Sequence, residues 1–166
     1  MSTRSPRSEP APVPAEVVDI ERALSRITHL AGRVRQHERL MAAAGVPLDR
    51  ATVSVLRQLA DRDPLRPSEL AARLAVEPSH VTRQVQRLEQ LGYVARVADP
   101  EDRRAQRIEL TADGAAVVDR IREASRRGMQ NALKDWSPED LRQLAALFNR
   151  MVDDFVSSAA EAEAAD

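Results

Sequence analysis

The sequence predicts a mainly α-helical protein that carries one small antiparallel β-ribbon. Over most of the 166 residues, apolar side chains recur every three or four positions, which is the spacing of amphipathic helices. One segment, Tyr93–Leu110, instead holds two short stretches that suit strands, joined by a charged turn that contains proline. Prolines stand where the central helices should begin, and glycines stand where helices should end. These patterns indicate the order helices, ribbon, helices along the chain.

The N-terminal part is expected to contain a disordered arm followed by two helices. Residues 1–15 hold four prolines and no hydrophobic period, so we expect them to be disordered. Residues 16–44 carry apolar side chains at intervals of about 3.5 residues, which predicts one long helix that packs along other helices. Gly45 ends this helix, and Asp49 is expected to cap the next one, which runs to about Asp61.

Two helices separated by a tight turn are expected in the middle of the chain. Pro67 and Pro78 each suit a first helical position, where the missing N–H group costs nothing. In the second helix, apolar residues at intervals of four, three and three are expected to form a buried stripe: Val81, Val85, Leu88 and Leu91. Gly92 suits the end of this helix, where a positive φ angle is needed.

The outer face of this second helix is polar. At 100° per residue, five side chains point away from the stripe, with His80 at its margin: Ser79, Thr82, Arg83, Gln86 and Arg87. Hydroxyl, amide and guanidinium groups of this kind pair with base edges and phosphates in a DNA major groove. An ordinary solvated helix would show the same composition, so the inference depends on the surrounding elements. The net charge of the chain is only −1, so a DNA-binding surface would have to be local.

The ribbon follows directly and has a charged tip, Asp99–Arg104. Alternation in its second strand directs Ile108 and Leu110 to one side, and Leu65 can add a short third strand. An arginine at a ribbon tip can enter a minor groove, and a nearby carboxylate can hold that arginine extended.

Two long helices are expected after the ribbon, with Thr111 and Ser137 as their N-caps. The last helix carries an apolar strip that the remaining chain is too short to cover within one subunit: Leu141, Leu144, Phe148, Met151 and Phe155. We therefore expect the first helix and the last two helices to interlock with a second copy of the chain. Residues 157–166 are acidic and rich in alanine, and we expect them to form a frayed end.

The run from Pro67 to Gly114, PSELAARLAVEPSHVTRQVQRLEQLGYVARVADPEDRRAQRIELTADG, resembles the winged helix-turn-helix of the MarR family of bacterial transcription regulators. Its Asp102-Arg103-Arg104 tip and the following Leu110–Gly114 segment are similar to that family's wing motif and helix start. The resemblance implies one domain over residues 16–156, with these parts: dimerisation helices at 16–44 and 111–156, and the winged helix-turn-helix at 49–110.

The resemblance also implies site residues. Base or phosphate contacts are expected from the second helix and the wing tip: Ser79, His80, Thr82, Arg83, Gln86, Arg87, Arg103 and Arg104. Within this set, Arg104 is carried over as the minor-groove residue and Arg103 as a phosphate contact. Asp102, outside the set, is carried over as the buttress of Arg104. His80 either binds DNA or caps its own helix. Glu77 departs from the family pattern, in which Ser or Thr usually occupies the cap before this helix.

On this resemblance the chain is expected to be a homodimeric repressor that binds double-stranded DNA. Its two recognition helices would enter successive major grooves of a pseudo-palindromic operator, with the wings in the flanking minor grooves. In the family a small-molecule effector, typically an aromatic or phenolic anion, releases the DNA, although no pocket residues follow from this sequence. Two alternatives stay open, a transcriptional activator and a winged helix that binds another protein.

Composition argues against several other classes. The chain has no cysteine, which excludes disulfides, thiol redox sensing and thiolate metal sites. His29 and His37 are about 80° out of line on a helix, so no metal is expected, and no cofactor motif is present. No glycine-rich phosphate loop or activated nucleophile is recognisable, which argues against an enzyme. No apolar run is long enough to span a membrane, and we expect a cytoplasmic protein.

Overall fold

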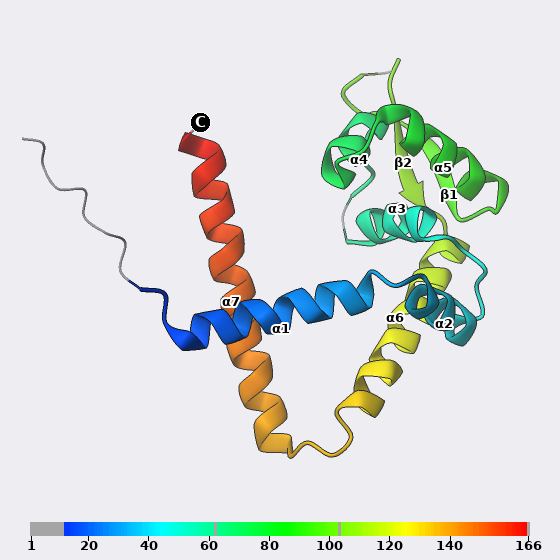
Figure 1. Ribbon diagram of the computed structural model, residues 1–166. Helices are drawn as coiled ribbons and strands as arrows, with labels where there is room; N and C mark the ends of the chain where they lie inside the picture. The colour runs from blue at the N-terminus through cyan, green and yellow to red at the C-terminus, as the bar shows by residue number, and fades with distance from the viewer. Residues whose placement is uncertain (1–11, 62, 103, 166) are drawn as a thin grey trace, which may run out of the picture. The chain divides into compact units, whose positions relative to one another are not determined.

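A computed structural model describes residues 12–61, 63–102 and 104–165. The chain forms two compact units, Met1–Ala124 and Ser125–Asp166. The elements of the described residues follow in this order (Figure 1): α1 (Ala15–Ala31), α2 (Val34–Ala44), α3 (Arg50–Ala60), α4 (Pro67–Leu74), α5 (Pro78–Gln90), β1 (Val94–Ala98), β2 (Gln106–Leu110), α6 (Ala112–Ala132) and α7 (Pro138–Ala165). The predicted fold class, mainly α with one small antiparallel sheet, is confirmed. Most of the arm expected to be disordered, residues 1–11, lies outside the described residues.

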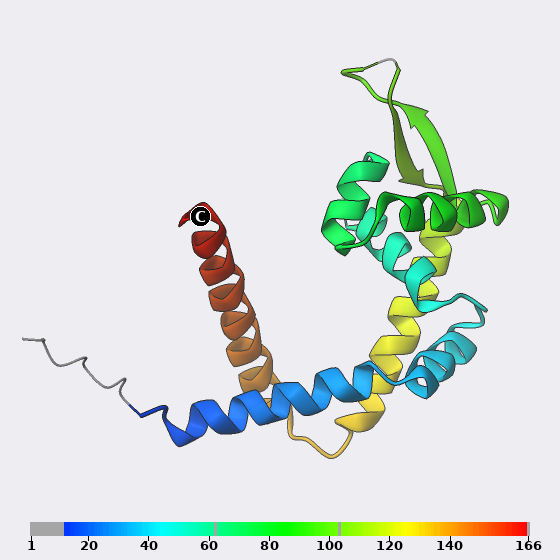
Figure 2. The same cartoon turned by 45° about the horizontal axis from the view of Figure 1, so that its top comes forward.

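The first unit packs α3, α4 and α5 around one hydrophobic core, together with the strands and the first part of α6. These elements contribute side chains that are at most 2% exposed, among them Leu56, Leu70, Leu88, Ile108 and Ile121. Each such burial stabilises the folded state by about 1.5–3 kcal/mol, before the cost of ordering the chain is subtracted. Figure 2 shows the ribbon of β1 and β2 projecting beyond this group of helices.

The buried stripe of α5 is confirmed at three of its four predicted positions. Val81, Val85 and Leu88 are each at most 1% exposed, but Leu91 is 44% exposed. Leu91 is the C-cap residue of α5 and still has helical dihedral angles (φ −81°, ψ −7°), but the helix ends there and its side chain stays exposed. The positive φ expected at Gly92 is present, at +75°, and it turns the chain away after Leu91.

The single helix predicted over residues 16–44 is wrong at one point, because the chain breaks between α1 and α2. Arg33 is extended there (φ −71°, ψ 134°), which interrupts the helical hydrogen bonds. The Arg50 guanidinium, in the first turn of α3, donates to the main-chain carbonyls of Ala31, Gly32 and Arg33 at 3.0–3.3 Å. These bonds connect the start of α3 to the break, where the Arg33 carbonyl also accepts from the main-chain N–H groups of Gln36 and His37.

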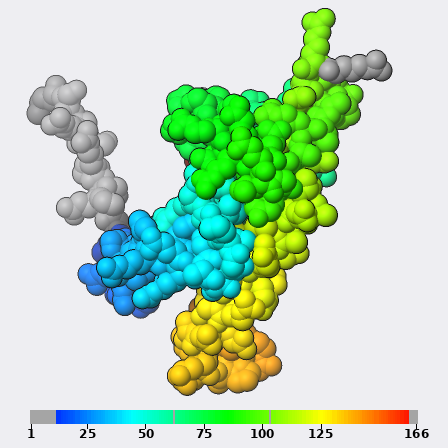
Figure 3. Space-filling model, turned by 90° about the vertical axis from the view of Figure 1, so that its right-hand side faces the viewer, coloured from blue at the N-terminus to red at the C-terminus, as the bar shows by residue number. Residues whose placement is uncertain are grey.

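The ribbon is a regular antiparallel pair in which Val94 faces Leu110 and Ala98 faces Gln106. Leu65 adds the expected short third strand, since its N–H and carbonyl both bond to the main chain of Ile108, at 3.0 and 2.8 Å. Ile108 is completely buried, as the alternation of the strand predicted. In the space-filling view the tip of the ribbon stands out from the surface (Figure 3).

The second unit consists of the end of α6 and all of α7. Ser137 caps α7 as predicted, because its hydroxyl oxygen accepts a hydrogen bond from the Asp140 N–H at 3.1 Å. The predicted apolar strip lies open on this helix, where Phe148 is 43% and Phe155 62% exposed. The structure differs from the expected frayed end at residues 157–166, because α7 stays helical through Ala165.

Close packing between α6 and the start of β1 requires a glycine at position 114. Thr111 caps α6 as predicted, since its hydroxyl accepts from the Gly114 N–H at 3.1 Å and donates to the Gly92 carbonyl at 2.6 Å. A Cβ atom on Gly114 would lie 1.9 Å from the carbonyl oxygen of Tyr93. The last residue of the motif LTADG therefore lets the helix approach the ribbon.

We predict that Gly114→Ala lowers the free energy of unfolding by about 1–3 kcal/mol or more, because α6 must shift away from Tyr93. Gly128→Ala on the same helix is the control. A Cβ there meets nothing within 4 Å, so alanine should stabilise α6 by up to about 1 kcal/mol. Urea denaturation measures both changes. Similar values for the two variants would contradict the close approach at Gly114.

Candidate nucleic-acid interface

The candidate interface is built on α5, whose two faces differ in burial. The inner face holds the helix against the core through the buried stripe described above. The outer face exposes the whole set that the sequence predicted: Ser79, His80, Thr82, Arg83, Gln86 and Arg87. Among the described residues, neither Arg83 nor Gln86 has a side-chain hydrogen bond or ion pair. The donors and acceptors of these two side chains are therefore available to a ligand.

The first turn of α5 presents main-chain N–H groups without a side-chain cap. Glu77 occupies the N-cap position, and its carboxylate makes no capping hydrogen bond. The His80 side chain is exposed and makes no hydrogen bond within the described part of the chain, so it does not cap the helix either. The Thr82 hydroxyl donates to the Pro78 carbonyl at 3.0 Å, which leaves its lone pairs as acceptors. Uncapped amides at a helix start attract anions such as phosphate.

Polar contacts from the start of α3 fix the position of α5. The buried Thr52 hydroxyl lies 2.8 Å from the Asp49 carboxylate and 2.7 Å from the side-chain amide oxygen of Gln84. The Arg87 guanidinium forms an ion pair with the same carboxylate of Asp49. Partial burial acts to raise the pKa of Asp49, but the hydrogen bonds from Thr52 and the charge of Arg87 outweigh it and lower the pKa. Of the predicted contact residues, Arg87 thus already has a partner within the protein.

The wing tip differs from the arrangement that the sequence implied. Asp102 was expected to hold the side chain of Arg104, but its carboxylate instead accepts from the main-chain N–H of Arg104, at 2.9 Å. The Arg104 side chain is exposed and has no partner among the described residues. Arg103, the predicted phosphate contact, lies outside the described residues.

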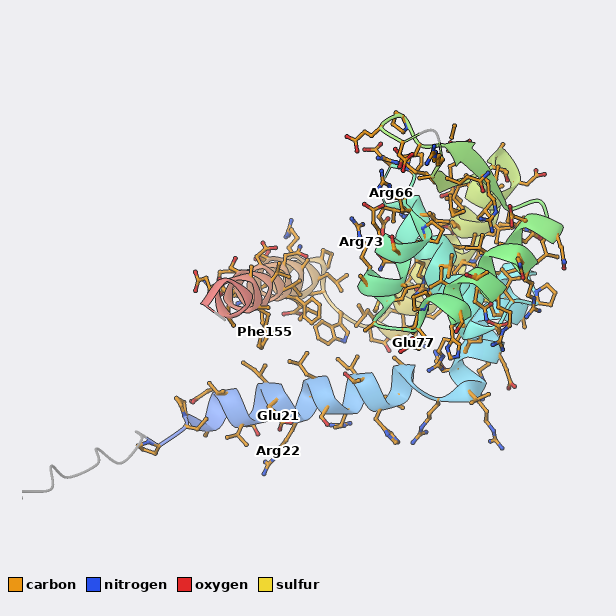
Figure 4. The ribbon with its side chains drawn as sticks, turned by 90° about the horizontal axis from the view of Figure 1, so that it is seen from above. Glu21, Arg22, Arg66, Arg73, Glu77 and Phe155 are labelled. Atoms are coloured by element: carbon orange, nitrogen blue, oxygen red, sulfur yellow. The ribbon has the colours of Figure 1, made fainter. Side chains whose placement is uncertain are left out.

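The best-coordinated carboxylate of the wing is Asp99, which sequence reasoning missed. Its side chain is fully buried, and one oxygen accepts from the Nε atoms of Arg66 and Arg107, at 2.6 and 2.8 Å. Arg66 lies just before α4 (Figure 4), whereas Arg107 belongs to β2. The hydrogen bonds from Arg66 and then Arg107 hold the pKa of Asp99 well below its ordinary value, although desolvation opposes them. An aspartate directly before a proline turn is a common turn-forming pattern, and that signal could have drawn attention to it.

Comparison with known proteins places the chain in a family. The family model described as the MarR family matches residues 48–105. The regulator YcgE of Bacillus subtilis, described as an uncharacterized HTH-type transcriptional regulator, is 31% identical over 155 residues, which are 92% of this chain and 93% of YcgE. The chain belongs to the MarR family of transcriptional regulators.

Other relatives of this MarR family chain agree with the assignment. The HTH-type transcriptional regulator PecS of Dickeya dadantii is 32% identical over 87 residues, about half of each chain (52%). The crystal structure of the transcriptional regulator Tm0710 from Thermotoga maritima superimposes with a TM-score of 0.66 at 29% identity, covering 83% of this chain and 97% of that one. These proteins are described as transcriptional regulators, which agrees with the expectation that the chain is a regulator and not an enzyme. No helix of the described residues is long and apolar enough to cross a membrane.

The buried carboxylate of Asp99 gives a pH-dependent prediction. A lowered folded-state pKa means that Asp99 stabilises the fold fully above about pH 4, the ordinary aspartate pKa, and that this contribution is lost as the pH falls further. We predict that Asp99→Asn reduces the free energy of unfolding at neutral pH, and that its difference from the wild type shrinks progressively below about pH 4. Urea denaturation across this pH range measures the difference. A constant difference at every pH would show that the aspartate does not stabilise the fold through its charge.

Proposed function

We propose that the protein is a homodimeric repressor that reads a pseudo-palindromic operator and is released from it by a small aromatic anion. The observation that carries the proposal is the outer face of α5, where Arg83 and Gln86 are exposed and have no side-chain partner in the described part of the chain. Guanidinium and amide groups recognise guanine and adenine edges respectively in a major groove. The exposed Arg104 at the ribbon tip is suited to the adjacent minor groove.

The exposed apolar helices support a dimer. On α1, Ile20 and Ile27 are 48% and 57% exposed, and on α7, Leu147 and Phe155 are 51% and 62% exposed. Contiguous apolar surfaces of this kind on a water-soluble protein usually mark an interface. A two-fold symmetric dimer would present two copies of α5, and two-fold symmetry in a protein matches a pseudo-palindromic site. Repression and release by an effector rest on the family resemblance.

We predict steeply salt-dependent, sequence-selective binding to the DNA that flanks the protein's own gene. Arg83→Ala should weaken that binding by about 1–3 kcal/mol and reduce the preference for the operator over random DNA, because base contacts are lost. Fluorescence anisotropy over a salt series, combined with footprinting, measures affinity and the protected site.

Arg26→Ala is the matched control for charge. Arg26 is an exposed arginine on α1, far in sequence from the recognition helix, and it should leave operator preference unchanged. If Arg83→Ala and Arg26→Ala have equal effects, α5 does not read bases. If the wild type binds no duplex more tightly than random DNA, even among sequences selected from a library, the proposed function is wrong. A reporter that falls in activity when the gene is deleted would indicate an activator instead.

Dimer formation gives a separate prediction. Phe148→Glu should raise the dimer dissociation constant by about a hundredfold or more, because each dimer loses the burial of two phenylalanine side chains. Arg150→Glu is the control, since two residues further along α7 a side chain points to the opposite side of the helix. Analytical ultracentrifugation measures both. A wild-type chain that is monomeric at micromolar concentration, or a Phe148→Glu variant that dimerises normally, would contradict the proposed interface.

A further inference from the structure

We infer that Asp99 is the positioning residue of the wing, fixing the tip and the DNA-directed Arg104 relative to the rest of the first unit. The inference rests on the proposed DNA-binding function of the wing. It assigns to Asp99 the orienting role that the sequence pattern suggested for Asp102.

The tip is held from inside by Asp99. One oxygen of its carboxylate accepts from the main-chain N–H groups of Glu101 and Asp102, at 2.8 and 3.2 Å. Its own N–H donates to the Ala105 carbonyl at 3.2 Å, which closes the base of the loop. Within the loop, Ala105 N–H donates to the Asp102 carbonyl at 2.9 Å. Asp99 therefore organises the short segment from which Arg104 projects.

The same carboxylate connects the tip to the fold. Its second oxygen takes Nε–H donors from two directions, Arg66 before α4 and Arg107 in β2. Because Arg66 is also the N-cap residue of α4, and its N–H donates to Glu69 of that helix at 2.6 Å, its position follows that of α4. A two-stranded ribbon alone is only marginally stable and bends readily. Beyond the Leu65–Ile108 pairing, the bridge from Arg66 through Asp99 attaches the wing to the helices close to its tip.

Neighbouring acids do not share this role. Glu101 lies 3.8–3.9 Å from the guanidinium groups of Arg66 and Arg107, and its side chain is 79% exposed, so its ion pairs contribute little. Asp102 bonds only to the main chain inside the tip. Among the described residues of the tip, Asp99 is the carboxylate that accepts hydrogen bonds from both arginines.

A double-mutant cycle on DNA affinity tests the inference, with a duplex selected by the wild-type protein from a random-sequence library as the probe. Arg104→Ala should weaken binding about tenfold or more. Asp99→Asn should weaken DNA binding to a similar extent, although the loss of a negative charge by itself would favour binding to DNA. The double variant should bind within about twofold of Arg104→Ala alone, because Asp99 acts through Arg104. Glu101→Gln, the matched control two residues further along the tip, should not weaken binding.

Independent effects would overturn the inference: a double variant whose loss is the product of the two single losses, or an Asp99→Asn variant with wild-type affinity. An Arg104→Ala variant without effect would overturn it as well, and would remove the wing from the proposed DNA contacts. Loss of sequence preference in the wild type itself would instead contradict the proposed function.

Hydrogen exchange provides a readout that needs no DNA and separates positioning from unfolding. In Asp99→Ala, which removes the acceptor oxygens, main-chain amides of Glu101, Asp102 and Arg104 should exchange faster, while those of α5 keep wild-type protection. Arg66→Gln is the second variant, because it removes one attachment and leaves the hydrogen bonds inside the tip in place. It should weaken DNA binding without changing exchange at Glu101. Unchanged tip exchange in Asp99→Ala, or equal acceleration throughout the first unit, would contradict the role assigned to Asp99.

Discussion

The structure depends on the carboxylate of Asp49, at the point where α3 begins. It satisfies the Thr52 N–H at 2.8 Å, as a capping side chain should, and it also forms the ion pair with Arg87 of α5. Removing a capping group alone typically costs about 0.5–2 kcal/mol. Here the same change would also release a contact that orients α5, so helix capping and placement of the proposed recognition helix depend on one group. The next residue, Arg50, holds the break between α1 and α2, so the start of α3 touches both regions.

A similar arrangement recurs at the wing. Asp99 and Asp49 are both aspartates that accept main-chain N–H groups within a turn and arginine donors from distant segments. The pKa of each is lowered, because the sum of these donors exceeds the cost of desolvation. The two elements expected to meet DNA are thus each fixed from the inside by a carboxylate. The outward arginines Arg83 and Arg104 have no acidic partner among the described residues. A fixed support reduces the entropy lost in ordering the main chain on binding, whereas each exposed arginine side chain still loses its rotamer freedom.

The sequence predicted the parts that depend on local patterns. Helix starts at Pro67 and Pro78, the caps Asp49 and Ser137, and the positive φ of Gly92 all follow from neighbours a few residues away. The errors concern tertiary contacts. Apolar periodicity runs through Gly32 and Arg33 without interruption, and nothing local shows that Arg50 stabilises a break there. Likewise Asp102 and Asp99 look equally suitable beside the wing arginines. The two aspartates differ in their contacts, because Asp99 accepts a hydrogen bond from Arg66. That arginine lies 33 residues before Asp99 and contacts it only in the folded chain.

The break between α1 and α2 affects how a proposed dimer could transmit a signal. Arg50 donates to three carbonyls across the break, so a shift of α1 would strain contacts at the first turn of α3. The same turn contains Thr52, whose hydroxyl approaches Gln84 of α5 at 2.7 Å. If α1 packs against a second copy, as its exposed isoleucines favour, a change in that packing would reach α5 through the contacts of Arg50 and Thr52. An effector would need only to bind one arrangement of the dimer more tightly than another. The shift it causes in the equilibrium between them is set by that difference in affinity.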